Sequence, residues 1–199
     1  MKYIEYVKRE FSRPEFPAFT VADVRLSLEG KGLSDAYLNL MLHNLFKSGK
    51  AWKITRGIYT FHNDVTVVGF AYRPFYYGME SALALRGFSD QGVNLVVMTA
   101  RNVRTGVRSF IGRNYRVHRI AKDRMFGYSL LKYGGYWMPV SDAEKTVIDM
   151  IESGDHIAES AMAAIKKVLN KKKLAAYLKR CSSETEANVM HATGIKRFE

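Results

Sequence analysis

The sequence has few of the residues that build disulfide-rich or membrane-spanning proteins. Its 199 residues include one cysteine, Cys181, so no disulfide can form within the chain and no cysteine-based metal site is expected. No apolar run approaches the roughly 18 residues of a membrane span. The first residues, MKYIEYVKREF, lack the apolar core of a signal peptide. We therefore expect a reduced, cytoplasmic protein with no membrane partner.

Acidic residues are also scarce. The chain has 19 Asp and Glu against 31 Lys and Arg, which gives a formal net charge of +12. Such a surface attracts polyanions, so nucleic acid is the leading partner class, ahead of an acidic protein. Part of the excess is local, because residues 101–124 contain eight basic residues and Asp123 as their only acidic one.

Signals for catalysis or cofactor binding are missing as well. The five histidines show no H-x-x-x-H spacing, and no glycine-rich phosphate loop is present. Glu144 and Lys145 resemble part of a nuclease motif, but Ser141 and Glu144 have the spacing of a helix capping box, which is the simpler interpretation. We expect no enzyme activity, no cofactor and no metal, and a structural role for Cys181.

The first 62 residues have the pattern of a small DNA-binding module. Helical spacing predicts a helix over residues 2–11, a second after the N-cap Thr20, with Val24, Leu26 and Leu28 as apolar residues, and a third from Ser34 to the stop at Gly49. Two short strands follow, 51–55 and 58–61, around an Arg56-Gly57 turn. This order is typical of a winged helix-turn-helix, in which the third helix enters the major groove and the hairpin contacts the DNA backbone.

The predicted third helix separates apolar from polar residues. Leu38, Met41, Leu42 and Leu45 fall on one face. The candidate DNA-binding residues lie on the other face, at the helix start and on the hairpin: base edges for Tyr37, Asn39, His43 and Asn44, phosphates for Lys47, Lys50, Lys53 and Arg56, and the N-cap Ser34. Trp52 is expected to pack the hairpin onto the helices. The outward Leu40 leaves a protein contact open instead.

The remaining chain predicts a second domain of class α+β. After a connector over 63–75, residues 76–199 predict a mixed α/β domain with a small, mostly antiparallel sheet and C-terminal helices. Strand alternation places Arg104, Arg108 and Arg116 on an exposed face. The secondary basic surface is expected to comprise Arg101, Arg104, Arg108, Arg113 and Arg116. It is either a solvated sheet face or a second anion-binding surface that extends a DNA footprint or docks an acidic protein.

Three motifs, in order, resemble the AbiEi-type antitoxins of type IV toxin–antitoxin systems. They are TRGIY in the hairpin, YYGMESALALRG from Tyr76 to Gly87, and SDAEKTVID from Ser141 to Asp149; Thr55 stands where that family has a basic residue. The resemblance implies an N-terminal domain that binds inverted repeats upstream of its own operon and represses it. It also implies a C-terminal domain that counteracts a nucleotidyltransferase-like toxin.

The sequence therefore predicts a sequence-specific transcriptional regulator that acts on double-stranded DNA as a monomer or homodimer, cooperatively on an inverted-repeat operator. A cognate toxin is a possible second partner. Two alternatives stay open: a protein-interaction module with a basic surface and no specific DNA site, and a nucleic-acid enzyme that uses the C-terminal domain.

Overall fold

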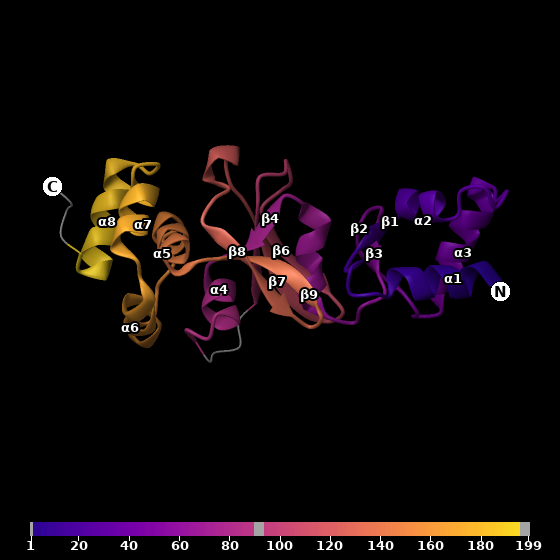
Figure 1. Cartoon of the computed structure of the whole chain (residues 1–199), viewed down its shortest axis with the longest axis horizontal. Coiled ribbons are helices and arrows are strands. Elements are labelled where there is room, and N and C mark those ends of the chain that lie inside the picture. Colours follow the sequence, from indigo (N-terminus) through magenta and orange to yellow (C-terminus); the bar gives the residue numbers. More distant parts are fainter. Residues whose placement is uncertain (1, 90–93, 196–199) are drawn as a thin grey trace. The chain divides into compact units, whose positions relative to one another are not determined.

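A computed structural model describes residues 2–89 and 94–195. Its elements are numbered in chain order, and Figure 1 labels many of them. The chain divides into two compact units: unit 1 comprises residues 1–73, 109–113 and 134–136, and unit 2 comprises residues 74–108, 114–133 and 137–199. The predicted connector, 63–75, therefore falls mostly within unit 1. Within the described ranges, no helix has both the length and the apolar character needed to cross a membrane.

Unit 1 contains the predicted helices and hairpin. Its elements are α1 (Lys2–Phe11), β1 (Phe19–Thr20), α2 (Val21–Ser27), α3 (Asp35–Lys47), β2 (Trp52–Thr55), β3 (Ile58–Thr60) and the 3-10 helix η1 (Val65–Tyr72). The strands form an antiparallel sheet in the order β1-β3-β2. Strand β1 was not predicted, because two residues are too few to show a strand period.

Side-chain caps set the starts of α2 and α3. Thr20 and Asp23 form a reciprocal capping box, in which the Asp23 carboxylate accepts the Thr20 backbone N–H at 2.7 Å. Ser34 caps α3 by accepting the Tyr37 backbone N–H. Gly49 then ends the helix with φ +65°. These local interactions confirm the predicted helix starts.

The core of unit 1 joins the three helices to the sheet. Its buried apolar residues include Val7 and Phe11 of α1, Val24 of α2 and the whole apolar stripe of α3. Phe19 of β1 packs on Phe11 with ring centroids 4.9 Å apart. The helix bundle and the small sheet therefore share one core.

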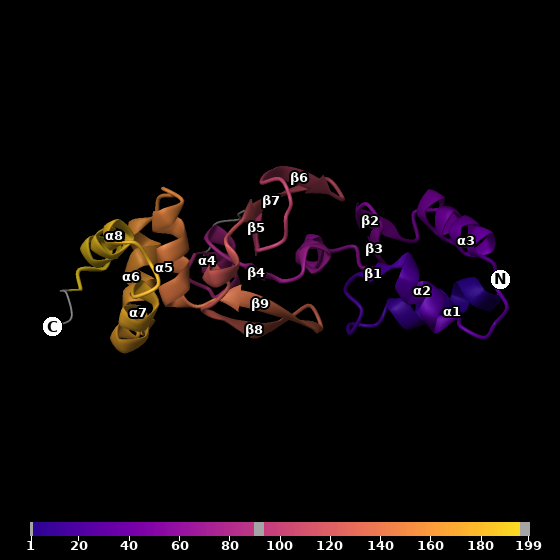
Figure 2. The same cartoon turned by 90° about the horizontal axis from the view of Figure 1, so that it is seen from above.

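Unit 2 is a six-stranded sheet with helices. Its elements are β4 (Phe75–Tyr77), α4 (Glu80–Leu85), β5 (Leu95–Thr99), β6 (Gly106–Phe110), β7 (Arg113–Arg119), η2 (Lys122–Arg124), β8 (Tyr128–Tyr133), β9 (Tyr136–Ser141), α5 (Ala143–Glu152), α6 (Glu159–Val168), α7 (Lys171–Leu178) and α8 (Ser183–Thr193). Figure 2 shows the strands in the order β6-β7-β5-β4-β9-β8, which leaves β6 and β8 at the edges.

The sheet has six strands, more than the small sheet that was predicted, and two of its neighbouring pairs are parallel. The β4–β5 pair is antiparallel, but β5 pairs with β7 and β4 pairs with β9 in parallel. Each parallel pair joins strands that are separated in sequence by other elements. Such long-range pairing leaves no local signal, because it depends on how distant strands meet.

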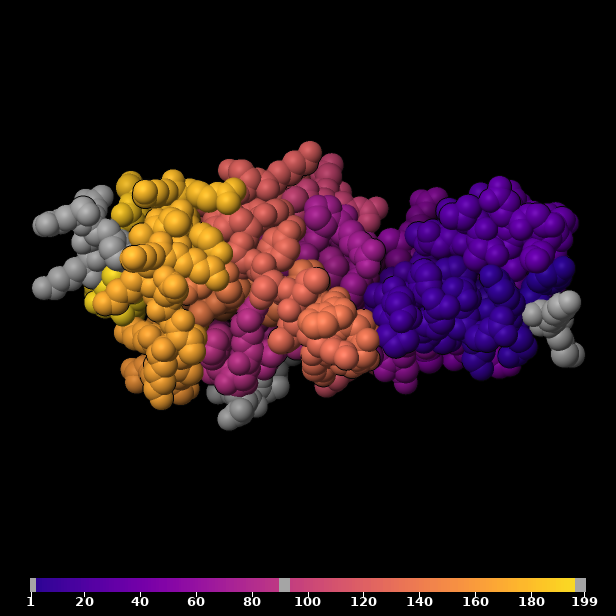
Figure 3. All heavy atoms as spheres, viewed as in Figure 1, coloured from indigo at the N-terminus to yellow at the C-terminus, as the bar shows by residue number. Residues whose placement is uncertain are grey.

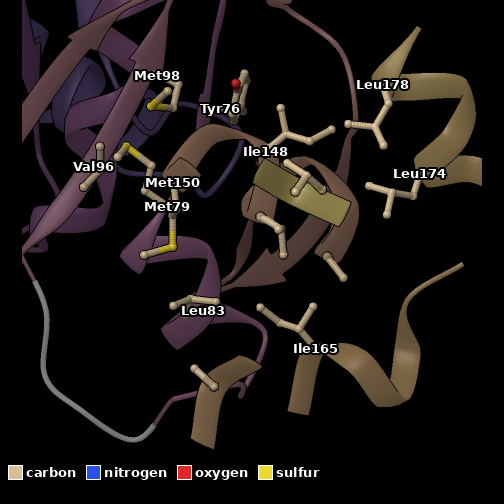
Figure 4. Packing of buried hydrophobic residues seen from close by; sticks show 14 residues of the cluster. Tyr76, Met79, Leu83, Val96, Met98, Ile148, Met150, Ile165, Leu174 and Leu178 are labelled. Atoms are coloured by element: carbon tan, nitrogen blue, oxygen red, sulfur yellow. The ribbon is translucent and has the colours of Figure 1, made fainter. Parts of the chain in front are cut away.

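A large apolar core lies between one sheet face and the helices (Figure 4). Tyr76 and Met98 of the sheet meet Val147 and Ile148 of α5, and Leu174 of α7 packs into the same cluster. Burying each such side chain contributes about 1.5–3 kcal/mol to folding. This core explains why eight consecutive residues of α5, 143–150, are buried.

Two charged residues and a phenol are buried inside this core. Lys145 is 0% exposed and Asp149 3%. Their side chains form an ion pair one helical turn apart, and the Tyr76 hydroxyl donates to the other Asp149 oxygen at 2.9 Å. Burial, with the Asp149 charge as the next cause, raises the pKa of Tyr76 well above its usual value, so the phenol stays a donor.

The predicted capping box at the start of α5 is wrong. Asp142, not Ser141, is the N-cap and accepts the Lys145 backbone N–H at 2.9 Å. The Ser141 hydroxyl bonds to Thr146, and the Glu144 carboxylate accepts the backbone N–H of Asn170 at 2.6 Å. Glu144 therefore joins α5 to the start of α7.

Replacing Lys145 by Met should lower the free energy of unfolding by about 3–5 kcal/mol, because it leaves the Asp149 carboxylate buried without its cation. Urea denaturation measures this loss. The double variant Lys145→Met/Asp149→Leu should be more stable than the single one, since no unpaired charge remains. Equal losses in both variants would contradict this account of the buried pair.

Candidate nucleic-acid interface

The polar face of α3 is exposed along its length. The apolar residues Leu38, Met41, Leu42 and Leu45 are each 2% exposed. The predicted base-edge residues Tyr37, Asn39, His43 and Asn44 are all exposed, as are the predicted phosphate residues Lys47, Lys50, Lys53 and Arg56 and the N-cap Ser34. Amide, imidazole and ammonium groups are those that bind base edges and phosphates.

Two residues limit how this face can be used. Tyr37 packs edge-on against Tyr3 of α1, with ring centroids 6.4 Å apart, so only part of its ring is available. Leu40 lies in the middle of the polar face with 57% of its surface exposed. The face therefore offers one apolar and several polar contacts.

The β2–β3 hairpin follows this helix in the sequence and carries basic residues. Lys53 and Arg56 are exposed, and the turn uses Gly57 at φ +77°, where a side chain would be strained. Lys53 pairs with Tyr59 across the strands. The Tyr59 ring stacks on Phe46 of α3 at 4.3 Å between centroids. This stack fixes the hairpin to the helix.

Tyr59 thus has the packing role that was predicted for Trp52. Trp52 is half-buried and does not belong to the apolar cluster of the helices. Cross-strand partners share one face of a sheet, and successive residues of a strand alternate between faces. Because Trp52 pairs with Thr60 and Lys53 with Tyr59, the Trp52 side chain lies on the face opposite Tyr59.

A hollow near the α2–α3 connection was not predicted. It measures about 690 Å³, and its lining includes Leu26, Leu28 and Leu33. Leu26, one of the apolar residues of α2, has 70% of its surface exposed. A seven-residue helix has too few turns for its periodicity to distinguish a core position from its neighbour.

The secondary basic surface is smaller than predicted. Arg101, Arg104 and Arg113 are exposed, whereas Arg108 is half-buried and its guanidinium donates to the Arg104 carbonyl at 2.7 Å. Arg119 is exposed as well. These residues remain candidates for binding phosphates or an acidic surface.

Arg116 is the exception, and its predicted exposed position is wrong. Its guanidinium pairs with Glu80 at 3.3 Å and Asp155 at 3.1 Å. Arg116 aligns with Val96, whose side chain lies in the core beneath the helices, so both residues face that side of the sheet. His118 is the next residue on this face, and burial, with the Arg116 charge second, lowers its pKa.

Arg116→Gln should lower the free energy of unfolding by about 1–2 kcal/mol, because its ion pairs are neither fully exposed nor fully buried. Arg113→Gln, the same change at an exposed site, should alter it by less than about 0.5 kcal/mol. Urea denaturation of both variants tests the assignment. Equal effects would place Arg116 among the exposed surface residues after all.

Glu144 and Cys181 both contact other residues of unit 2. Glu144 is 3% exposed and bonded to α7 as described above. Cys181 is half-buried, with its thiol 3.4 Å from the Arg124 guanidinium, and burial raises its pKa. Among the described residues, no group of three or more His, Cys, Asp or Glu side chains could hold a metal ion.

Comparison with known proteins adds fold similarity alone. No protein-family model and no curated protein sequence matches the chain. The crystal structure of the RV2827C protein from Mycobacterium tuberculosis is similar, with a TM-score of 0.64 and 12% sequence identity over 98% of this chain and 77% of that one. The mixed α+β architecture is thus shared with a solved protein.

Proposed function

We propose that the protein is a sequence-specific DNA-binding transcriptional regulator and that unit 1 is a winged helix-turn-helix. The observation that carries the proposal is the order α1-β1-α2-α3-β2-β3 with a polar, exposed α3 face. In winged helices the third helix occupies the major groove, which is about 12 Å wide and admits a helix.

Specificity would come from the middle of α3. Asn39, His43 and Asn44 are exposed, and their amide and imidazole groups form hydrogen bonds of the kind that recognise base edges. Lys47 and Lys50 follow at the C-terminal end of the helix and suit phosphates. One helix reads a short half-site, so strong repression uses two copies on an inverted repeat, either as a homodimer or as cooperating monomers.

Affinity would come from phosphate contacts. The exposed Lys53 and Arg56 of the hairpin lie where a wing meets the backbone, and the chain's charge of +12 draws it to DNA. The exposed arginines Arg101, Arg104 and Arg113 are further candidates for phosphate contacts. Because each phosphate contact releases counterions, the affinity falls steeply with salt.

The regulatory target and the second role rest on the motif resemblance. By that resemblance the protein represses its own operon and counteracts a nucleotidyltransferase-like toxin from unit 2. The exposed Leu40 favours a second candidate function, a protein-interaction module with no specific DNA site. That alternative predicts weak binding that is indifferent to sequence.

A binding titration with DNA from immediately upstream of the gene, against a scrambled probe, tests the regulator proposal. We expect tight binding to the upstream probe alone. Lys53→Ala/Arg56→Ala should weaken it and lower the slope of log affinity against log salt by about two. Lys171→Ala/Lys172→Ala, which removes the same charge from exposed positions on α7, is the matched control and should change the affinity much less.

The base-reading role has its own variant. Asn39→Ala should reduce the discrimination between the two probes by about 1–3 kcal/mol while leaving the salt slope unchanged. Equal, salt-sensitive binding of the wild-type protein to both probes would instead contradict specific recognition.

A further inference from the structure

Exposed apolar side chains concentrate on the β8–β9 hairpin. Leu130 is 63% exposed, Trp137 57% and Tyr128 40%. Singly exposed apolar residues are common, but a group on one element marks an interaction surface. The atoms of this hairpin, salmon to orange by residue number, form part of the surface in Figure 3.

These side chains share one face of the hairpin. Its turn has two residues, Gly134 and Gly135, with φ +55° and +93°, so Tyr133 lies opposite Tyr136. Even-numbered residues of β8 and odd-numbered residues of β9 therefore face the same way. Tyr128, Leu130, Lys132 and Trp137 form this apolar surface with a single charge.

Strand β8 is also an edge of the six-stranded sheet, with β9 as its only strand neighbour among the described residues. One side of its backbone lacks a sheet partner and can template another strand. Its six residues, YSLLKY, include one charged residue and no proline to block such pairing.

An arginine from α4's C-terminal end keeps this edge in place. Arg86 donates to the Ser141 carbonyl at 2.5 Å and the Val140 carbonyl at 2.8 Å on β9, and to the Ser129 hydroxyl at 2.9 Å on β8. The guanidinium thus spans both strands of the hairpin. A fixed strand loses little conformational entropy when a partner binds.

We propose that β8 binds an extended, acidic segment of a partner protein, which adds to the sheet as a seventh strand. Its apolar side chains pack on Leu130, Tyr128 and Trp137, and a carboxylate two residues along the segment pairs with Lys132. Backbone hydrogen bonds supply affinity and the side chains supply selectivity, as in other cases of strand addition.

Charge favours an acidic partner over a second copy of this chain. The segment from Met125 to Ser141 has Lys132 as its only charged residue and no carboxylate. Two copies, each at +12, repel one another as they approach.

The test uses the full chain with Trp52→Phe, so that Trp137 is the only tryptophan, and it requires no DNA. The probe is the fluorescein-labelled peptide Gly-Thr-Val-Thr-Val-Thr-Glu-Gly, in which two Val side chains and the Glu side chain lie on one face of the strand, followed by fluorescence anisotropy and Trp137 emission. We expect this peptide to bind about fivefold more tightly than its counterpart with Lys in place of Glu, since the charge that meets Lys132 is reversed. N-methylation of alternate amides on the pairing side should abolish binding.

Leu130→Ser should weaken binding about tenfold. Val107→Ser on β6, a similar change at a 68% exposed residue of the opposite edge, should leave it unchanged. Equal affinity for both peptides, or unaltered binding of the N-methylated peptide or of Leu130→Ser, would overturn the proposal. A dimer in sedimentation experiments that Leu130→Ser dissolves would also overturn it, because the occupant would then be a second copy.

Discussion

Burial of the apolar stripe on α3 is the constraint from which the candidate interface follows. Leu38, Met41, Leu42 and Leu45 are almost fully buried, and each contributes about 1.5–3 kcal/mol. The combined burial energy of these four side chains determines which face of the helix is turned inward. The rotation of the helix about its axis is therefore fixed. The exposure of Asn39, His43 and Asn44 is a consequence of the core and needs no DNA to hold it.

In unit 2 several charged residues are engaged within the protein. Lys145 and Asp149 are paired inside the core, and Arg124 contacts Glu152 and Cys181. Arg116 is held by Glu80 and Asp155. The basic run of residues 101–124 therefore overstates the positive surface. The arginines that lie exposed at its start and on the β6–β7 hairpin are those that can meet an anion.

Much of unit 1 could be predicted because its signals are local. The caps Thr20 and Ser34, the period of α3 and the Arg56-Gly57 turn each lie within a few residues of the structure they determine. The prediction was wrong where the deciding partner is distant in sequence. Arg116 faces Asp155, and Tyr59 rather than Trp52 reaches Phe46. The N-cap of α5 is Asp142 rather than the predicted Ser141, whose hydroxyl is hydrogen-bonded to Thr146 instead.

We propose that α3 lies in the major groove, and cleavage of DNA from that helix tests this proposal most directly. Cys181 is the only cysteine, so Cys181→Ser provides a background in which His43→Cys can carry an iron–EDTA group. The account predicts cuts confined to two symmetric half-sites in the upstream DNA. Uniform or absent cutting from position 43, with localised cutting from Arg113→Cys in the same background, would contradict it.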